Sequence, residues 1–240
     1  MTRKVCFIST LSDSLLIYDI NLILDAYREA KKCKFINDVI IICNDDILKL
    51  NIDKLGYKTY IINNKYLNST ELIIYYLKRY PEICDIVINI KPDNKFIKSS
   101  YIDLCIKNYF KHKFNIDLNV LCTDIITNHS IKSTTLCYIE DKEIIKSQDV
   151  CKLVINKNND IIYSSRNIIS SSKIHEIDVD AIYYCHINIF VFEKEYLINE
   201  YMKNNNSNEK IEFLKIIDDG YKINVSIINP LEINPLEINH

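Results

Sequence analysis

The sequence predicts an α/β fold built on a doubly wound, mostly parallel sheet with helices on both faces, and a mixed or antiparallel extension in the second half. In the first half, short apolar runs of strand length alternate with longer segments of helical period. Parallel strands need such helices between them, because a tight turn joins only antiparallel strands. After residue 119 strand-like runs follow one another with few helices between them, which is typical of antiparallel additions to a sheet.

Four strand and helix steps are predicted in the first half. The opening strand is the apolar run 5–8, and the following helix, 20–32, places Ile23, Ala26 and Ala30 on one face. The next three steps are strand 39–43 with helix 45–55, strand 59–62 with helix 69–80, and strand 86–90 with a helix from about 100 to 110. The N-cap candidates are Asp45 and Asp46 for the second helix, and Ser69 and Thr70 for the third.

The second half is predicted to be richer in strands. Strands are expected at 120–123, 135–138, 152–155, 161–164, 187–192 and 222–227, and helices at 194–203 and 209–217. A length of 240 residues, 48% of them hydrophobic, suits one large domain, which we place at 1–228. Residues 229–240 repeat the pentapeptide NPLEI and are interpreted as a low-complexity tail.

Charge and cysteine usage limit the partners and the compartment. A net charge of −2, from 30 basic and 32 acidic side chains, gives no overall field that would attract nucleic acid or an anionic membrane. The nine cysteines are scattered through apolar runs, which indicates reduced, buried thiols. No apolar stretch resembles a signal peptide or reaches membrane-spanning length without charges. A cytoplasmic protein with neither nucleic acid nor membrane as a partner is therefore expected.

Several common kinds of site are excluded by residue type and spacing. Only two glycines, Gly56 and Gly220, occur in the chain, so no glycine-rich loop can hold a phosphate with successive backbone N–H groups. The five histidines lie far apart and lack the spacing of a zinc site. None of the serines stands in the G-x-S-x-G pattern of a nucleophile elbow.

The segment 85–93, DIVINIKPD, is a strand that leads to a carboxylate, Asp93. Nucleotidyl transfer needs a metal-holding carboxylate at such a strand end. Through Ile97 the segment resembles, without a gap, a strand of the CMP-sugar synthetase family, chiefly of the CMP-3-deoxy-manno-octulosonate (CMP-KDO) synthetases. Further segments resemble that family in order and spacing over roughly the whole chain: KLVIN at 152–156, IYSSRNII at 162–169, HINIFVF at 186–192, EKIEFL at 209–214 and GYKI at 220–223.

The resemblance implies a nucleotide-diphospho-sugar transferase-like fold and a cytidylyltransferase that forms a homodimer. The implied reaction joins CTP to an acidic sugar, KDO-like or sialic-acid-like, and releases pyrophosphate with Mg²⁺ as cofactor. The catalytic residues carried over are Asp93, which would hold Mg²⁺, and Lys152 and Arg166, which would lie near the sugar acid. The substrate-binding residues carried over are Ser69, Thr70, Glu71, His186, Glu209 and Glu212, and the second metal ligand would be Asn229.

The chain departs from the family in two places. Segment 9–18, STLSDSLLIY, is shorter than the family's first loop and lacks the two Arg, the Lys and the Gly that grip the triphosphate. Each lost charge-assisted contact is worth about 1.5–3 kcal/mol. The second metal-binding acid is also absent, and Asn229, or Asn234 in the repeat, would bind Mg²⁺ more weakly than a carboxylate.

These departures favour an alternative, a catalytically inactive relative that acts as a binding or scaffold protein. A glycosyltransferase is a further alternative, because Asp178-Val179-Asp180 has the spelling of an Asp-x-Asp metal motif, although it lies outside the first α/β half. The candidate residues also have purely structural explanations. Asp93 would be a solvated turn residue after Pro92, Lys152 and Arg166 exposed strand ends, and His186 a hydrogen-bonded core histidine.

Overall fold

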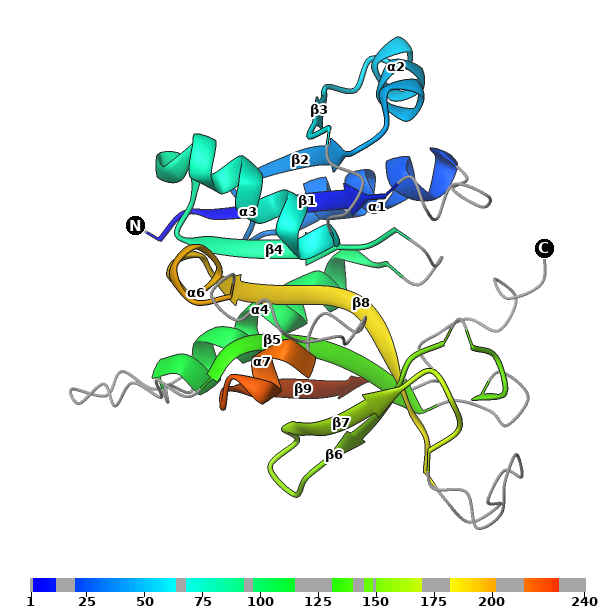
Figure 1. The fold of residues 1–240 in the computed structure, drawn as a ribbon, viewed down its shortest axis with the longest axis vertical. Helices are drawn as coiled ribbons and strands as arrows, with labels where there is room; N and C mark the ends of the chain where they lie inside the picture. The colour runs from blue at the N-terminus through cyan, green and yellow to red at the C-terminus, as the bar shows by residue number, and fades with distance from the viewer. Residues whose placement is uncertain are drawn as a thin grey trace. The chain divides into compact units, whose positions relative to one another are not determined.

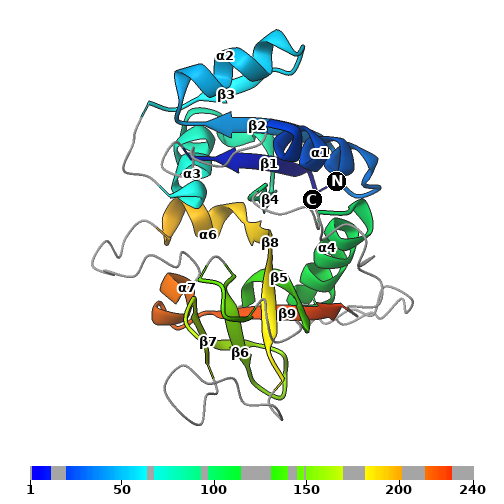
Figure 2. The ribbon, with the colours of Figure 1, turned by 90° about the vertical axis from the view of Figure 1, so that its right-hand side faces the viewer.

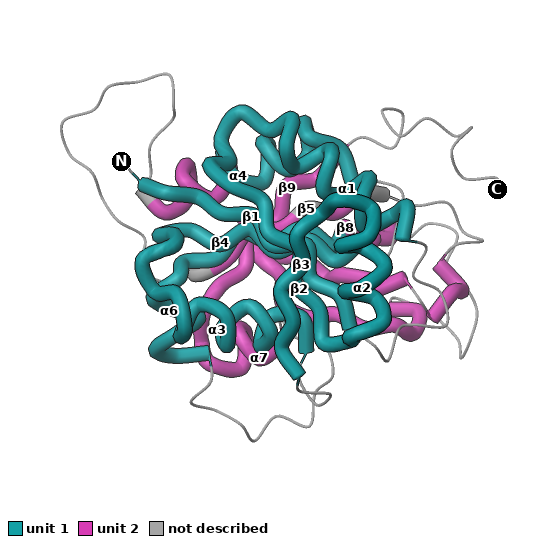
Figure 3. The backbone as a smooth tube through the Cα atoms, turned by 90° about the horizontal axis from the view of Figure 1, so that it is seen from above, with its two compact units in different colours: residues 1–107, 188–207 teal, residues 108–187, 208–240 magenta. Residues whose placement is uncertain are grey.

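The computed structural model describes nine ranges of the chain: 2–11, 20–63, 68–92, 97–114, 131–139, 145–148, 150–169, 182–201 and 214–228. The chain forms two compact units, which Figure 3 distinguishes by colour. Unit 1 comprises residues 1–107 and 188–207, and unit 2 comprises 108–187 and 208–240. The single domain expected at 1–228 stays a prediction, and the tail 229–240 lies outside the described residues.

Unit 1 is built on four parallel strands in the order β3-β2-β1-β4 (Figure 1). The strands are β1 (Lys4–Thr10), β2 (Asp38–Cys43), β3 (Thr59–Ile61) and β4 (Ile86–Ile90). On the other side of β4 lies β8 (Tyr184–Glu193), whose residues from Ile189 to Glu193 pair with it in antiparallel direction. The sheet is therefore mostly parallel, as predicted.

Helices cover both faces of this sheet (Figure 2). On one face lie α1 (Ile20–Lys32) and the first part of α4 (Ser99–Phe114), and on the other lie α3 (Ser69–Arg79) and α6 (Lys194–Asn199). The remaining helices of the unit are α2 (Asp46–Lys54), which contacts β3, and the short 3-10 helix η2 (Pro81–Ile83). The doubly wound arrangement that the sequence predicts is confirmed.

Burial on both faces explains why the central strands are almost continuously apolar. The side chains from Val5 to Ile8 in β1 are fully buried, and β2 and β4 are buried along nearly their whole length. A strand covered by helices on both sides has no solvent face on which to alternate polar residues. A buried polar side chain inside such a strand is therefore unusual, and Asn89 in β4 is one.

Unit 2 contains the mixed strand pairs expected from the second half of the sequence. Strand β5 (Ile131–Ile139) runs parallel to β9 (Lys222–Ile228). The short helix α7 (Leu214–Asp218) precedes β9 in the sequence. Strand β6 (Lys152–Ile155) is antiparallel to β7 (Ile161–Ser165) and to the start of β8. Asn159, in the turn between β6 and β7, has a φ of 59°, and asparagine tolerates this left-handed conformation better than most residues.

Several predicted boundaries differ from the structure. The N-cap of α3 is Asn68 and not Ser69 or Thr70, which are its first helical residues. Helix α6 ends at Asn199 rather than Lys203, and β5 begins four residues earlier than expected. The N-cap prediction for Asp45 is confirmed, because its side chain accepts a hydrogen bond from the Leu48 backbone N–H. The strand expected at 120–123 lies outside the described residues.

Candidate active site

The structure describes six of the ten candidate site residues. Ser69, Thr70 and Glu71 belong to unit 1, at the start of α3. Lys152, Arg166 and His186 belong to unit 2, on or directly after its strands. The other four candidates, which lie outside the described residues, are Asp93, Glu209, Glu212 and Asn229. The two aspartates of the Asp-x-Asp spelling, Asp178 and Asp180, also lie outside them.

In unit 1 the strand order creates a topological switch point between β1 and β4. The chain leaves β1 for β2 and β3 on one side and returns to β4 on the other side of β1. In open α/β sheets ligands bind outside the carboxyl ends of the strands at such a point. Ser9 lies near the carboxyl end of β1, and Asn89 is the penultimate residue of β4, so both belong to this edge.

A buried hydrogen-bond network joins the two strands to α3 at this edge. The Ser9 hydroxyl donates to Asn89 Oδ1 over 2.6 Å. The Asn89 Nδ2 group donates to Ser69 Oγ and to Thr70 Oγ1, each over 3.3 Å. All four side chains are at most 1% exposed. The network therefore anchors the first turn of α3 to the ends of β1 and β4.

The candidate Glu71 takes part in a capping box at the start of α3. The Asn68 side chain accepts from the Glu71 backbone N–H over 2.8 Å, and Glu71 Oε2 accepts from the Asn68 backbone N–H over 3.0 Å. Both interactions satisfy N–H groups that a helix start otherwise leaves unpaired. The described role of Glu71 is thus to stabilise the helix start, and its expected contact with substrate stays a prediction.

Lys152 is buried, and its ammonium group lies among backbone carbonyls. Its Nζ donates to the carbonyls of Ser147 at 2.9 Å and Val150 at 2.8 Å, and also to the Arg166 carbonyl. Burial lowers the pKa of the Lys152 ammonium from its ordinary value, and the neighbouring thiols of Cys185 and Cys151 oppose that shift. The explanation of Lys152 as an exposed strand end is wrong, because its side chain is 1% exposed.

Arg166 differs from Lys152 in being exposed. It follows β7 directly, and its Nη1 donates to the Gln148 carbonyl over 3.1 Å. Its own carbonyl is one of the acceptors of Lys152. The buried ammonium therefore holds the backbone of Arg166, while the guanidinium group extends toward solvent.

His186 is buried in β8 and hydrogen-bonded to another strand of unit 2. Its Nε2 lies 2.7 Å from Thr135 Oγ1 of β5. Its backbone N–H donates to the Cys151 carbonyl over 2.9 Å. These contacts fit the explanation of a hydrogen-bonded core histidine. The expected place of His186 in a sugar pocket stays a prediction.

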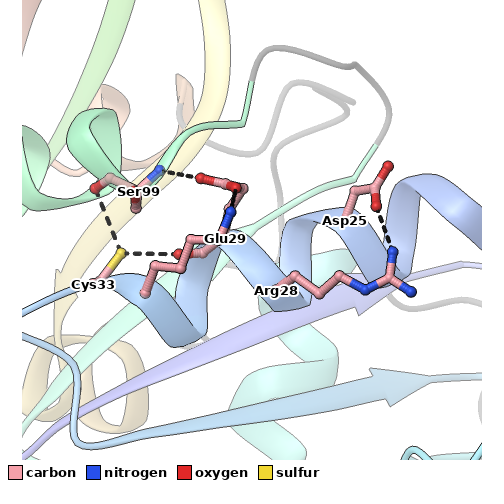
Figure 4. Close-up of polar contacts among 6 residues, drawn as sticks. Asp25, Arg28, Glu29, Cys33 and Ser99 are labelled. Carbon is pink, nitrogen blue, oxygen red and sulfur yellow. Dashed lines mark hydrogen bonds and ion pairs between the residues drawn. The ribbon is translucent and has the colours of Figure 1, made fainter.

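A second set of hydrogen bonds in unit 1, which the sequence analysis did not predict, joins α1 to the start of α4 (Figure 4). Glu29 Oε2 accepts from the Ser99 backbone N–H over 2.9 Å, and Lys32 also donates to the Glu29 carboxylate. Burial alone would raise the pKa of the Glu29 carboxyl, but the hydrogen bonds from Lys32 and Ser99 outweigh it and lower that pKa. Cys33 Sγ lies 3.4 Å from the Glu29 carbonyl and 3.5 Å from the Ser99 carbonyl.

Neither a metal cluster nor a membrane helix is found in the described part of the chain. Within the nine described ranges, no group of three or more His, Cys, Asp or Glu side chains is placed to hold a metal ion. Among the helices that the structure describes, none combines the length and hydropathy of a membrane span. Eight cysteines fall in those ranges, and none of these eight forms a disulfide there.

Comparison with known protein sequences gives matches over most of the chain. A family profile described as "Cytidylyltransferase" matches residues 15–224. The chain is 23% identical over 213 residues to the 3-deoxy-manno-octulosonate cytidylyltransferase of Protochlamydia amoebophila, covering 86% of this chain and 76% of that protein. It is 26% identical over 204 residues to the protein of the same name from Fusobacterium nucleatum, covering 83% of this chain and 74% of that protein.

Solved structures show the same fold. A CMP:2-keto-3-deoxy-manno-octonic acid synthetase, solved in complex with CTP, matches with a TM-score of 0.70 and 18% identity, covering 95% of this chain and 89% of that one. The inositol-1-phosphate CTP transferase from T. maritima matches with a TM-score of 0.54 and 13% identity, covering 100% of this chain and 92% of that one. The predicted α/β nucleotidyltransferase-like fold is thereby confirmed.

Proposed function

Because the chain belongs to the cytidylyltransferase family, we propose that it transfers CMP from CTP to an acidic sugar of the KDO or sialic-acid type. The observation that carries this proposal is the extent of the similarity, which spans 213 residues against a relative named for that activity on 3-deoxy-manno-octulosonate. The carboxyl edge at the switch point of unit 1 supports it, since this is where α/β sheets bind nucleotides.

In the proposed reaction a hydroxyl oxygen of the sugar forms a bond to the α-phosphorus of CTP. The bond between that phosphorus and the oxygen bridging to the β-phosphorus breaks, pyrophosphate leaves with the electron pair, and the hydroxyl proton passes to water. The sugar carboxylate needs a cationic partner, and Arg166 is suited to this role because it is exposed and its guanidinium group can bind a carboxylate in two places. Lys152 would act indirectly, by holding the Arg166 backbone.

Magnesium is the cofactor that we propose. Asp93 follows the described residue Pro92 at the end of β4, and a carboxylate oxygen is a donor that Mg²⁺ prefers. Asn229 follows β9 directly and would supply a weaker amide oxygen. When bound, Mg²⁺ would neutralise charge on the phosphates of CTP.

The test is a pyrophosphate-release assay on the purified chain, with each of the four nucleoside triphosphates, Mg²⁺ and a panel of sugar acids that includes KDO and a sialic acid. The expected result is release with CTP and one sugar acid, which stops when Mg²⁺ is chelated. Size-exclusion chromatography with light scattering on the same sample tests the proposed homodimer. The proposal is contradicted if none of the sugar acids supports pyrophosphate release under conditions where a related enzyme is active.

A second candidate function is that of an inactive relative that binds a nucleotide or a partner protein in the cytoplasm. The observation that favours it is the absence of any Lys or Arg from residue 5 to residue 27, the stretch in which the resembled family holds the triphosphate. A thermal-shift titration separates the two functions. A rise in melting temperature with CTP but no pyrophosphate release supports a binding protein. If CTP causes neither a rise in melting temperature nor pyrophosphate release, the scaffold role is the one that remains.

A further inference from the structure

Asn89 is a fully buried polar side chain at the switch point. It is 0% exposed, lies one residue from the end of β4, and stands opposite Phe7 of β1 in the parallel register. Its neighbours in the strand, Ile88 and Ile90, are also fully buried. An amide in such a place costs free energy unless every polar atom is hydrogen-bonded. A leucine would suit this position better if burial were the only requirement.

Both ends of the Asn89 amide are used, and each end binds a different element. Oδ1 accepts from Ser9 of β1, and Nδ2 donates to Ser69 and Thr70 of α3. All three partners are hydroxyl groups, and together they occupy both the acceptor and the donor end of the amide. The Asn89 side chain thus joins β4 both to α3, whose partners lie 19 and 20 positions away, and to β1, whose partner lies 80 positions away.

The network lies at the edge where a nucleotide is expected, yet Asn89 and Ser9 are too buried to touch one. Asn89 and Ser9 are at most 1% exposed. Any effect of these side chains on a nucleotide must therefore pass through the segments that they hold, which are the end of β1 and the first turn of α3.

We propose that Asn89 is a positioning residue for CTP, an inference that rests on the proposed cytidylyltransferase function. Its amide holds the end of β1 and the first turn of α3 at fixed places across the switch point, so that the exposed atoms of these segments are arranged for the nucleotide before it binds. A preorganised site binds more tightly, since less ordering is required on binding.

The test compares CTP affinity and steady-state kinetics in the full chain and in two variants, N89L and S9A. N89L removes both the hydrogen-bond acceptor and the donor of the amide and keeps a side chain of similar volume. S9A removes only the hydroxyl that donates to Asn89 Oδ1. We expect the Kd for CTP to rise about tenfold in N89L and about threefold in S9A, since buried hydrogen bonds of this kind are worth roughly 0.5–1.5 kcal/mol. The KM for CTP should rise while the KM for the sugar acid stays unchanged.

The matched control is T59V, which removes a buried hydroxyl at the amino end of β3 in the same unit. Its Kd for CTP should equal that of the wild type. The double variant S9A/N89L should bind no more weakly than N89L, because Ser9 acts through Asn89 and effects within one network are not additive.

Two results would overturn the inference in different ways. If the wild type binds CTP and N89L binds it equally well, the positioning role is wrong while the proposed function stands. If the wild type neither binds CTP nor releases pyrophosphate, the proposed function fails and this inference fails with it. Should N89L not fold, S9A decides alone, and an unchanged Kd for CTP in S9A contradicts the role.

Discussion

Lys152 is a buried cation whose charge is balanced by carbonyl oxygens of the backbone. Its ammonium donates to carbonyls of three residues, Ser147, Val150 and Arg166, and so joins the segment before β6 to the residue after β7. A lysine is rarely buried without such partners, because an ammonium group loses much hydration on burial. The arrangement suggests that Lys152 stabilises unit 2 and orients the backbone of Arg166.

Replacing Lys152 by methionine tests this role. K152M keeps most of the side-chain volume but leaves the three carbonyls without their donor, so we expect a loss of about 2 kcal/mol in the free energy of unfolding. Urea denaturation measures this loss. The control is K157M, which changes an exposed lysine in the turn between β6 and β7 and should alter stability by less than about 0.5 kcal/mol. Equal stability of the two variants would contradict the role.

The start of α3 is stabilised by its capping box as well as by the Asn89 network. Asn68 and Glu71 satisfy each other's backbone N–H groups, and Ser69 and Thr70 accept hydrogen bonds from Asn89. Helix α3 packs against both β1 and α6 in unit 1. A defined helix start matters here, because the candidate substrate-binding residues occupy its first turn.

Substituting the cap residue should destabilise the protein by the usual amount for a helix start. N68A is expected to lower the free energy of unfolding by about 1 kcal/mol, while N68S, which retains a capping oxygen, should lose much less. Urea denaturation of the two variants is the measurement. An equal loss in N68A and N68S would show that the side-chain oxygen at position 68 does not cap α3.

The contact between α1 and α4 is expected to make stability depend on pH. The Glu29 carboxylate accepts from Ser99 at the first residue of α4, and its pKa is lowered in the folded chain. A lowered pKa means that the folded state favours the carboxylate. Its contribution is therefore present above about pH 4.3, the value of an unperturbed glutamate, and is lost as the pH falls through the lower pKa of the folded state.

We expect E29Q to be less stable than the wild type at pH 7 and to lose less further stability on acidification from pH 5 to pH 3. Urea denaturation at several pH values in this window measures the difference. D25N is the control, because Asp25 forms an exposed ion pair with Arg28 in the same helix and such pairs contribute little. The assignment of this pH dependence to Glu29 is contradicted if E29Q loses as much stability between pH 5 and pH 3 as the wild type while D25N loses less.

Two long elements contribute residues to both compact units. Helix α4 passes from unit 1 to unit 2 after Lys107, and strand β8 passes from unit 2 to unit 1 after Ile187. Because the two units share this helix and this strand, neither unit can unfold without removing part of α4 and part of β8. For this reason we keep the prediction that residues 1–228 form one cooperative domain.

A single domain should unfold in a single transition. With 17 tyrosines and no tryptophan, tyrosine fluorescence reports on tertiary packing, and far-ultraviolet circular dichroism reports on helices and strands. The two signals should give the same midpoint in urea. Two separate unfolding transitions would instead show that the two units unfold independently, which would contradict the single-domain prediction.

Much of the architecture could be predicted from local sequence pattern. The strands at 86–90 and 152–155 and the helix at 20–32 were expected with the bounds that the structure gives them. These elements have clear patterns, because a buried strand is a short apolar run and an amphipathic helix repeats its apolar residues every three to four positions. The N-cap of α3 was misplaced by one or two residues, since Asn68, Ser69 and Thr70 are all capping residue types.

The fold class and the family resemblance follow from the sequence, because both depend on the order and spacing of apolar and polar residues along the chain. The burial of Lys152, the contacts of Asn89 with two other elements and the hydrogen bond from Ser99 of α4 to Glu29 are seen only in the folded chain. Apart from the hydrogen bond from Lys152 to the Val150 carbonyl, these contacts join residues that are five to 80 positions apart in the sequence. Such contacts arise from the packing of strands and helices, for which one-dimensional spacing carries no signal.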